Sequence, residues 1–344
     1  MTIHSPEKPA APSPPRRSLP RLIGSIIGAL AVAIALGATY AAIAGWIPGA
    51  GNRPISFNGG LLETPMTIPA LHLQRADGGT FETADLLGRY SLVFFGYTHC
   101  PDVCPLTLAH AAQVARSLGD DAAMLDVYLV TVDPERDTAE RMETYMANFG
   151  PRAVGLLGTA DALDASYQAF GASHAKRPDP NRPGEYTVDH SAILYLVEPT
   201  GAVRLIYPFN MEPELITADL KTLLAAQPIR LRDAWARPAP AGQTSGAYLT
   251  IQNVGRDDRL LGASAPVSDR VEVHRTSVEG GMASMHRMDA LAIPKGLTKL
   301  EPGGLHVMLM NLREPLASGT RVPLTLRFEK AGEQRTAAIV RAAN

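Results

Sequence analysis

Both cysteines of the 344-residue chain fall in one five-residue window, Cys100 to Cys104, directly after the apolar run 91–97. An apolar run of this length predicts a buried strand, and the prolines at 101 and 105 suit a loop that turns into a helix. The positive end of a helix lowers the pKa of thiols placed there. The window therefore predicts a reactive thiol pair or a metal site at a strand-to-helix junction.

The N-terminal region sets the expected compartment. Residues 22–46 carry no charge, and about 20 apolar residues suffice to cross a bilayer as a helix. Four basic residues precede this segment, so the positive-inside rule places residues 1–21, a proline-rich disordered lead, in the cytoplasm and the rest of the chain outside. A cleaved signal peptide is the alternative, because Ala42-Ile43-Ala44 resembles a cleavage site.

Strand and helix patterns alternate over residues 55–226, which predicts an α/β domain with helices on the faces of a sheet. Gly59-Gly60 predicts a turn near its start, and Asp137 and Glu140 have the spacing of a capping box. The expected strands are 91–97, 124–132, 192–197 and 203–207, and the expected helices are 106–118, 139–149, 160–170 and 212–224.

The pattern changes after a short linker at 225–228. Residues 229–344 show short strands separated by Gly-Gly and Pro-Gly turns and no helix pattern, so they predict an all-β sandwich. The expected strands are 246–253, 271–274, 305–309 and 322–328.

Charge and motifs exclude some functions. The formal net charge of −2 argues against a nucleic-acid partner. No nucleophile–base arrangement or phosphate-binding loop is evident in the sequence, so nothing predicts a hydrolytic enzyme.

The thiol pair suits a soft metal ion. Thiolate sulfur is a preferred donor for Cu(I), and imidazole is the expected third donor because two thiolates leave the site incomplete. A structural disulfide between Cys100 and Cys104 and a thiol–disulfide oxidoreductase are the alternatives. His99 is interpreted as a packing residue beside the site, and Asp133 as a cap on the turn before the second helix.

Three blocks of this region resemble one family. Residues 95–105, Phe-Gly-Tyr-Thr-His-Cys-Pro-Asp-Val-Cys-Pro, look like the signature of SCO/SenC proteins, and residues 131–138 and 188–196 are similar to two further blocks. The resemblance implies a thioredoxin-like fold and a membrane-anchored copper chaperone for the CuA centre of cytochrome c oxidase. It also implies that Cys100, Cys104 and His190 are the copper ligands.

Histidine and methionine cluster in the β region. His274 ends an expected strand, and Met282, Met285, His286 and Met288 follow in an expected loop. His306, Met308 and Met310 alternate, so they share one face of a strand. Thioether and imidazole donors bind Cu(I) without thiols, although methionine more often fills a core.

This region resembles the PCu(A)C periplasmic copper chaperones, whose pattern is H-x10-M-x21-H-x-M. Ten residues separate His274 from Met285, and His306-x-Met308 is intact. Twenty residues separate Met285 from His306, one fewer than the pattern, which leaves Met282 and Met288 as substitutes for Met285. The resemblance implies a cupredoxin-like sandwich that binds copper at His274, Met285, His306 and Met308.

Together these features predict a copper chaperone rather than an enzyme. We expect a single-pass protein of the bacterial inner membrane with both domains in the periplasm. It would bind Cu(I), with Cu(II) as an alternative at the thiol site, and deliver copper to the oxidase subunit that carries CuA. Thioredoxin-like reductants are expected partners, because Cys100 and Cys104 must be reduced before Cu(I) binds. A copper-sensing module is a further alternative.

Overall fold

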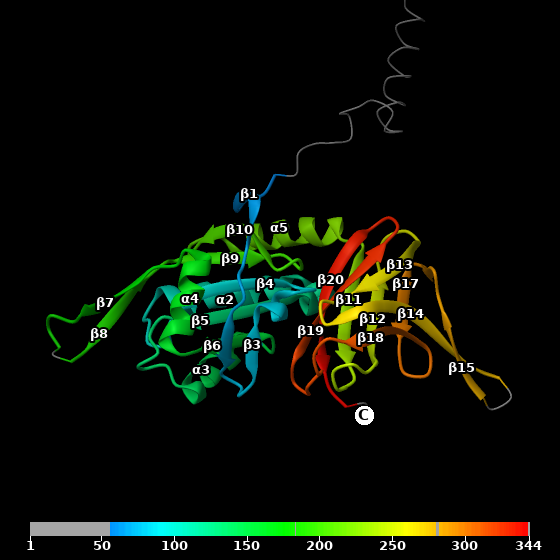
Figure 1. Ribbon diagram of the computed structural model, residues 1–344. Coiled ribbons are helices and arrows are strands. Elements are labelled where there is room, and N and C mark those ends of the chain that lie inside the picture. The colour runs from blue at the N-terminus through cyan, green and yellow to red at the C-terminus, as the bar shows by residue number, and fades with distance from the viewer. Residues whose placement is uncertain (1–55, 183, 280–281, 343–344) are drawn as a thin grey trace, which may run out of the picture. The chain divides into compact units, whose positions relative to one another are not determined.

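The computed structural model describes residues 56–342 apart from 183, 280 and 281. The predicted anchor at 22–46 and the lead before it lie outside these residues. Among the helices of the described residues, none is both long and apolar enough to cross a membrane. A compact unit begins at Phe57. Its chain forms an α/β part followed by a part made of strands (Figure 1).

An eight-stranded sheet forms the centre of the α/β part, with the order β1-β10-β9-β4-β5-β6-β2-β3. Strands β4, β5 and β6 run parallel, and β9 joins β4 in the antiparallel sense. Both β4 and β5 are buried along their whole length, as expected for parallel strands covered on two faces. The strands are β1 (Gly60–Thr67), β2 (His72–Arg75), β3 (Thr80–Glu82), β4 (Tyr90–Gly96), β5 (Leu125–Thr131), β6 (Ala153–Leu157), β9 (Ile193–Val197) and β10 (Ala202–Pro208).

Four α-helices accompany this sheet in the described residues, together with a separate two-stranded hairpin, β7-β8. The predicted helix at 106–118 begins three residues earlier, at Val103, so Cys104 lies in its first turn. The helices are α2 (Val103–Ser117), α3 (Ala139–Met146), α4 (Ala160–Phe170) and α5 (Pro213–Ala226), the 3-10 turns are η1 (Thr83–Leu86), η2 (Gly119–Met124) and η3 (Ala147–Phe149), and the hairpin strands are β7 (His174–Pro178) and β8 (Tyr186–His190).

Three local predictions in this part were wrong. Gly60 begins β1, which pairs with β10, instead of forming a turn. Residues 225 and 226 of the predicted linker belong to α5. The predicted capping box at Asp137 is replaced by Thr138, whose hydroxyl accepts a hydrogen bond from the Arg141 N–H. Asp137 makes other bonds, described below.

The second part is all-β in the described residues, as predicted, and its ten strands belong to one sheet. Buried side chains from strands far apart in the sheet order form a single apolar cluster, so the sheet curls around its core. The strands are β11 (Ile229–Ala236), β12 (Ser245–Asn253), β13 (Asp258–Ser264), β14 (Ser268–Glu279), β15 (Met282–Arg287), β16 (Leu291–Ile293), β17 (Gly296–Leu300), β18 (Leu305–Leu312), β19 (Arg321–Phe328) and β20 (Gly332–Val340).

The expected loop after His274 was also wrong. Strand β14 continues well beyond His274 to Glu279, and residues 282–287 return beside it as β15. Two runs joined by Gly-Gly are a hairpin signal that outweighs the polar composition of the segment. Met285 is therefore on a strand.

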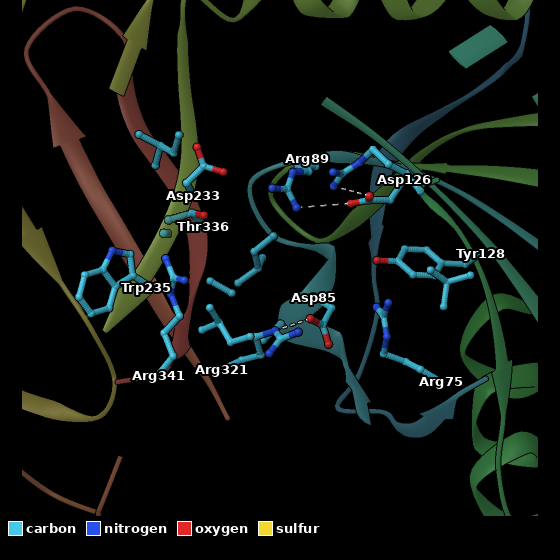
Figure 2. A pocket seen from close by; sticks show the side chains of 18 of the residues that line it. Arg75, Asp85, Arg89, Asp126, Tyr128, Asp233, Trp235, Arg321, Thr336 and Arg341 are labelled. Atoms are coloured by element: carbon cyan, nitrogen blue, oxygen red, sulfur yellow. Dashed lines mark hydrogen bonds and ion pairs between the residues drawn. The ribbon is translucent and has the colours of Figure 1, made fainter. Parts of the chain in front are cut away.

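Polar contacts join the two parts within the compact unit. Arg321 of β19 donates a 2.5 Å hydrogen bond to Asp85 of η1, and Arg230 of β11 pairs with Asp121 of η2. Figure 2 shows the charged side chains around a nearby pocket of about 420 Å³, with Arg89 and Asp126 among them. This contact is ionic in character and contrasts with the apolar core of each part.

Candidate metal centres

The thiol site lies where β4 ends and α2 begins. Cys104, in the first turn of α2, is fully buried, while Cys100, in the preceding loop, is half-buried. Both are free thiols. The Cys104 N–H donates to the Cys100 sulfur at 3.4 Å, so the amino-terminal end of the helix points at that sulfur. The disulfide considered from the sequence is not formed in this structure.

The pKa values of the two thiols are shifted in opposite directions. A hydrogen bond from Cys104 lowers the pKa of Cys100 far below its usual range, and contacts with His190 and helix N–H groups add to this shift. The pKa of Cys104 is raised, because it is the donor in that bond and because it is buried beside the Cys100 charge. The pair therefore holds one thiolate on the more accessible sulfur and one proton on the buried sulfur.

Gly96 makes room for the buried sulfur. A Cβ at this last residue of β4 would stand 2.7 Å from Cys104 Sγ and 2.9 Å from a ring carbon of Phe94. Side chains do not approach that closely, so the position needs glycine. The Phe-Gly-Tyr sequence before the cysteines thus reflects the packing of Cys104 on the end of the strand.

His190 completes the cluster from the β7-β8 hairpin. It is the last residue of β8, and its Nε2 lies 3.3 Å from Cys104 Sγ. Its ring is held edge-on by Phe94 and Tyr97. The donor atoms of Cys100, Cys104 and His190 all lie within 4.8 Å of one another, which is close enough for one small ion. A cleft of about 380 Å³ lined by Cys100, Pro101 and His190 borders the site.

Asp137 supports the cysteine loop. Its fully buried carboxylate accepts hydrogen bonds from the Thr98 N–H at 3.2 Å, the Thr98 hydroxyl at 2.6 Å and the Thr131 hydroxyl at 2.7 Å. The carboxylate thus ties the loop before Cys100 to the end of β5. The spacing of Asp137 and Glu140 predicts a helix cap, and the buried contact follows only from the fold.

His99 lies outside the donor cluster. Its Nε2 contacts Arg141, and its Nδ1 lies 3.3 Å from the Thr98 hydroxyl. This agrees with its interpretation as a residue beside the site. Asp133 does not cap a helix with its side chain: its carboxylate pairs with Arg136 and accepts a 2.8 Å bond from the Tyr186 hydroxyl.

The histidines and methionines of the β part lie on one face of the β15-β14-β18 segment. His274 is directly opposite His306 in the antiparallel pair, and Glu272 is opposite Met308. Met285 of β15 is opposite Thr276, two residues from His274, and so shares this face. The sheet therefore gathers all four residues predicted from the sequence onto one surface.

Hydrogen bonds leave one nitrogen of each imidazole open. His306 Nδ1 donates to the Gly304 carbonyl at 3.0 Å, so its Nε2 carries the free lone pair. His274 Nε2 lies 2.8 Å from Glu272 Oε2, and its buried Nδ1 has no hydrogen-bond partner among the described residues. The two ring centroids are 6.0 Å apart. An unpaired buried acceptor is what a metal ligand requires.

The methionines differ in how they could join this pair. Met308 is partly buried beside Glu272, whereas Met285 is 60% exposed. Met310 receives two 3.3 Å contacts from the Arg270 guanidinium, which occupy its sulfur. Met308 is thus the better placed thioether in the described structure, and Met285 stands at the accessible rim.

Comparison with known proteins gives the family of the first part. Residues 62–225 match the SCO1/SenC family model. A putative copper-binding protein of Stutzerimonas stutzeri is 35% identical over 145 residues, which cover 42% of this chain and 70% of that protein. The chain belongs to the SCO1/SenC family. The SCO2 homologue of Bos taurus mitochondria is 37% identical over 42% of this chain and 54% of that protein. The chain thus spans about half the length of the mitochondrial relatives it matches.

Solved structures resemble each part. Bradyrhizobium japonicum ScoI with copper bound is 35% identical and covers 45% of this chain and 98% of that one, with a TM-score of 0.42. Residues 229–340 match the model of the putative lipoprotein LpqE-like family. The copper-bound PCuAC domain from PmoF2 is 30% identical and covers 34% of this chain and 95% of that domain, with a TM-score of 0.29.

These comparisons confirm the predicted SCO/SenC resemblance and the PCuAC-type second part. The three donors that the resemblance assigned to the first part lie together in this chain.

Proposed function

We propose that this protein is a membrane-anchored copper chaperone that delivers Cu(I) to the CuA centre of cytochrome c oxidase. The observation that carries the proposal is the convergence of Cys100, Cys104 and His190, whose donor atoms lie within 4.8 Å of one another. Two sulfurs and one imidazole form a soft donor set that suits Cu(I). Copper is the cargo of this site.

The electrostatics of the pair suit capture and release. Cys100 supplies a thiolate in advance at the accessible edge of the site, because its pKa is lowered. Cys104 loses its proton as the ion binds, so uptake of Cu(I) releases one proton to solvent or to a nearby base. Delivery then proceeds by ligand exchange, in which a donor of the acceptor protein joins before a donor of this site leaves.

The β part supplies a second Cu(I) site in this proposal, at His274, His306, Met308 and Met285. The open nitrogens of the two imidazoles and the PCuAC resemblance support it. A cupredoxin-like sandwich is the fold that this resemblance implies. Its donors contain no thiol, so disulfide formation cannot disable the site. Such a site can hold copper in an oxidising compartment while Cys100 and Cys104 await reduction.

The proposed location follows from the N-terminal sequence. An uncharged segment at 22–46 after a basic lead would anchor the chain in the bacterial inner membrane and place both parts in the periplasm. That compartment contains the CuA domain to which the copper would pass.

Copper stoichiometry tests the binding half of the proposal. The reduced full-length chain should bind two Cu(I) ions, and a Cys100→Ser/Cys104→Ser chain should bind one. Titration of the loaded protein against an apo-CuA domain, followed by NMR of that domain, tests delivery. Retention of copper on this chain would indicate a sensor or store in place of a chaperone.

A further inference from the structure

The β7-β8 hairpin, which carries His190, is poorly anchored through its own strands. It forms a two-stranded sheet separate from the eight-stranded sheet, and such hairpins are marginally stable alone. All five residues of β7 are exposed, and Val188 is the one buried residue of β8. The end near His190 is tethered by β9, which begins at Ile193. The start of β8 needs another anchor.

Arg136 provides that anchor from the turn between β5 and α3. Its Nη1 donates to the Tyr186 carbonyl at 2.9 Å, and its guanidinium carbon lies 3.7 Å from the centroid of the Tyr186 ring. Its Nε pairs with the carboxylate of Asp133, which also accepts the 2.8 Å hydrogen bond from the Tyr186 hydroxyl. These three residues close a network around the first residue of β8.

The same network extends through Tyr97 to the loop that carries Cys100. The Arg136 guanidinium carbon lies 5.6 Å from the Tyr97 ring centroid. The Tyr97 hydroxyl accepts a 3.2 Å hydrogen bond from the Val188 N–H. The Tyr97 ring stands nearly perpendicular to the His190 ring, with the two ring centroids 5.9 Å apart. The Tyr97 carbonyl accepts from the Cys100 N–H at 3.3 Å. One tyrosine therefore contacts both elements that carry donors.

Asp133 explains why the network is stable. Its carboxylate is fully buried, and a buried charge is costly unless it is paired and hydrogen-bonded. Arg136 and Tyr186 supply that pairing, while the Thr131 hydroxyl accepts a bond from the Asp133 N–H at 3.0 Å. Undocking β8 would remove one of these partners, so the buried charge favours the docked hairpin.

We propose that Asp133, Arg136 and Tyr186 form a latch that holds the β7-β8 hairpin against the body and thereby positions His190 for copper. They are positioning residues, because none belongs to the donor cluster. The inference rests on the proposed copper site. When only a fraction of molecules has a docked hairpin, the apparent affinity falls by that fraction. Latch strength should therefore set the affinity of the site.

The test compares Arg136→Met with the native full-length chain. Methionine keeps the length of the side chain but removes its charge, hydrogen bonds and stacking. We expect Cu(I) binding, measured by competition with a chromophoric Cu(I) chelator, to weaken about tenfold, which corresponds to about 1.4 kcal/mol. In the metal-free protein, hydrogen exchange at the Val188 amide, which donates to the Tyr97 hydroxyl, should accelerate. Arg136→Lys, which keeps the charge without the planar fork, should restore part of both properties.

Two further variants guard against general misfolding. Tyr186→Leu removes the ring on which Arg136 stacks, at a partly exposed position. The buried Asp133 carboxylate keeps its ion pair with Arg136 in this variant. Tyr186→Leu should still weaken Cu(I) binding and accelerate hydrogen exchange in the hairpin. Arg182→Met is the matched control, because Arg182 is an exposed arginine between the two hairpin strands that pairs with Asp179 and Glu185 and not with the latch residues. It should leave affinity and exchange unchanged.

Native affinity and native exchange in both Arg136→Met and Tyr186→Leu would overturn the latch. If the native chain bound no Cu(I), the proposed function and the role of the latch in copper binding would both fail. Faster exchange confined to the hairpin would still show in that case that these residues hold it in place.

Discussion

His190 Nε2 lies 3.3 Å from the sulfur of Cys104, although 86 positions separate the two residues in the chain. The first turn of α2 carries the cysteine, and the last residue of the β7-β8 hairpin is the histidine. This approach turns a reactive thiol pair into a three-donor metal site. It favours the proposed chaperone over a thiol oxidoreductase, because exchange chemistry at two cysteines needs no imidazole from a distant strand.

Replacing His190 by alanine should lower the Cu(I) affinity of the first site by at least about tenfold, because even residues that only orient metal ligands contribute that much. Competition with a chromophoric Cu(I) chelator measures the change. His72→Ala is the control, since His72 is exposed on β2. An unchanged affinity in His190→Ala, together with full disulfide-exchange activity, would favour the oxidoreductase.

Alkylation at low pH should label Cys100 much faster than Cys104. The pKa of Cys100 is lowered and that of Cys104 is raised. At pH 6 Cys100 is therefore a thiolate, whereas a free cysteine with a pKa of about 8.5 is almost wholly protonated. Iodoacetamide should label Cys100 within minutes and leave Cys104 unmodified, as peptide mass spectrometry would record. Labelling of Cys100 should slow only as the pH falls through its lowered pKa. Equal labelling of both cysteines would contradict the assigned polarity.

Adding one methyl group at Gly96 should damage the site. The new Cβ would meet Cys104 Sγ at 2.7 Å, so Gly96→Ala must displace the sulfur or the end of β4. We expect weaker Cu(I) binding and a loss of about 1–3 kcal/mol in the free energy of unfolding, as for other overpacked cores. Urea denaturation and chelator competition measure the two effects.

Gly262→Ala is the matched control for this change, because its nearest neighbour, an Arg327 nitrogen, would lie 3.9 Å from the new Cβ. Equal behaviour of the two variants would show that Gly96 is not needed for packing.

Much of the first site could be predicted from local sequence. The strand before Cys100 and the helix after it follow from an apolar run and two prolines, so their junction was predicted to within three residues. The partnership with His190 could not follow from periodicity, because it depends on the path of a separate hairpin. It came from the family resemblance, and the fold places the donors accordingly.

The errors have a common physical origin. Asp137 has the spacing of a helix cap, yet its carboxylate instead accepts hydrogen bonds from two hydroxyl groups and a backbone N–H outside the helix. The position of Asp133 before Pro134 likewise predicts a local cap, whereas its partners are the Arg136 guanidinium and a tyrosine 53 positions away. The polar composition after His274 predicts a loop, although pairing with β14 satisfies the backbone of residues 282–287 as a strand. Tertiary partners decided each case.

Glu272 should control the proposed second copper site through His274. The Glu272 carboxylate contacts Nε2 of the His274 ring, which leaves Nδ1 as the nitrogen free to bind a metal. Arg270 and Arg287 lie 3.6 Å and 3.4 Å from the same carboxylate and hold it in place. The hydrogen bond with His274 lowers the pKa of Glu272, so the acceptor stays charged through neutral pH. In a Cys100→Ser/Cys104→Ser background, Glu272→Leu should weaken the remaining Cu(I) site about tenfold. Nitrogen NMR of the imidazoles should show a mixed His274 tautomer.

Glu329→Leu is the appropriate control for Glu272→Leu, because Glu329 is an exposed carboxylate of the same part whose side-chain partner is Arg259. It should change neither the tautomer nor the affinity. His306→Ala should reduce binding at least as strongly as Glu272→Leu, since it removes a proposed ligand rather than the residue that orients one. If His306→Ala kept full copper binding in the double-serine background, the metal would be held elsewhere and the imidazole pair on β14 and β18 would not be its site.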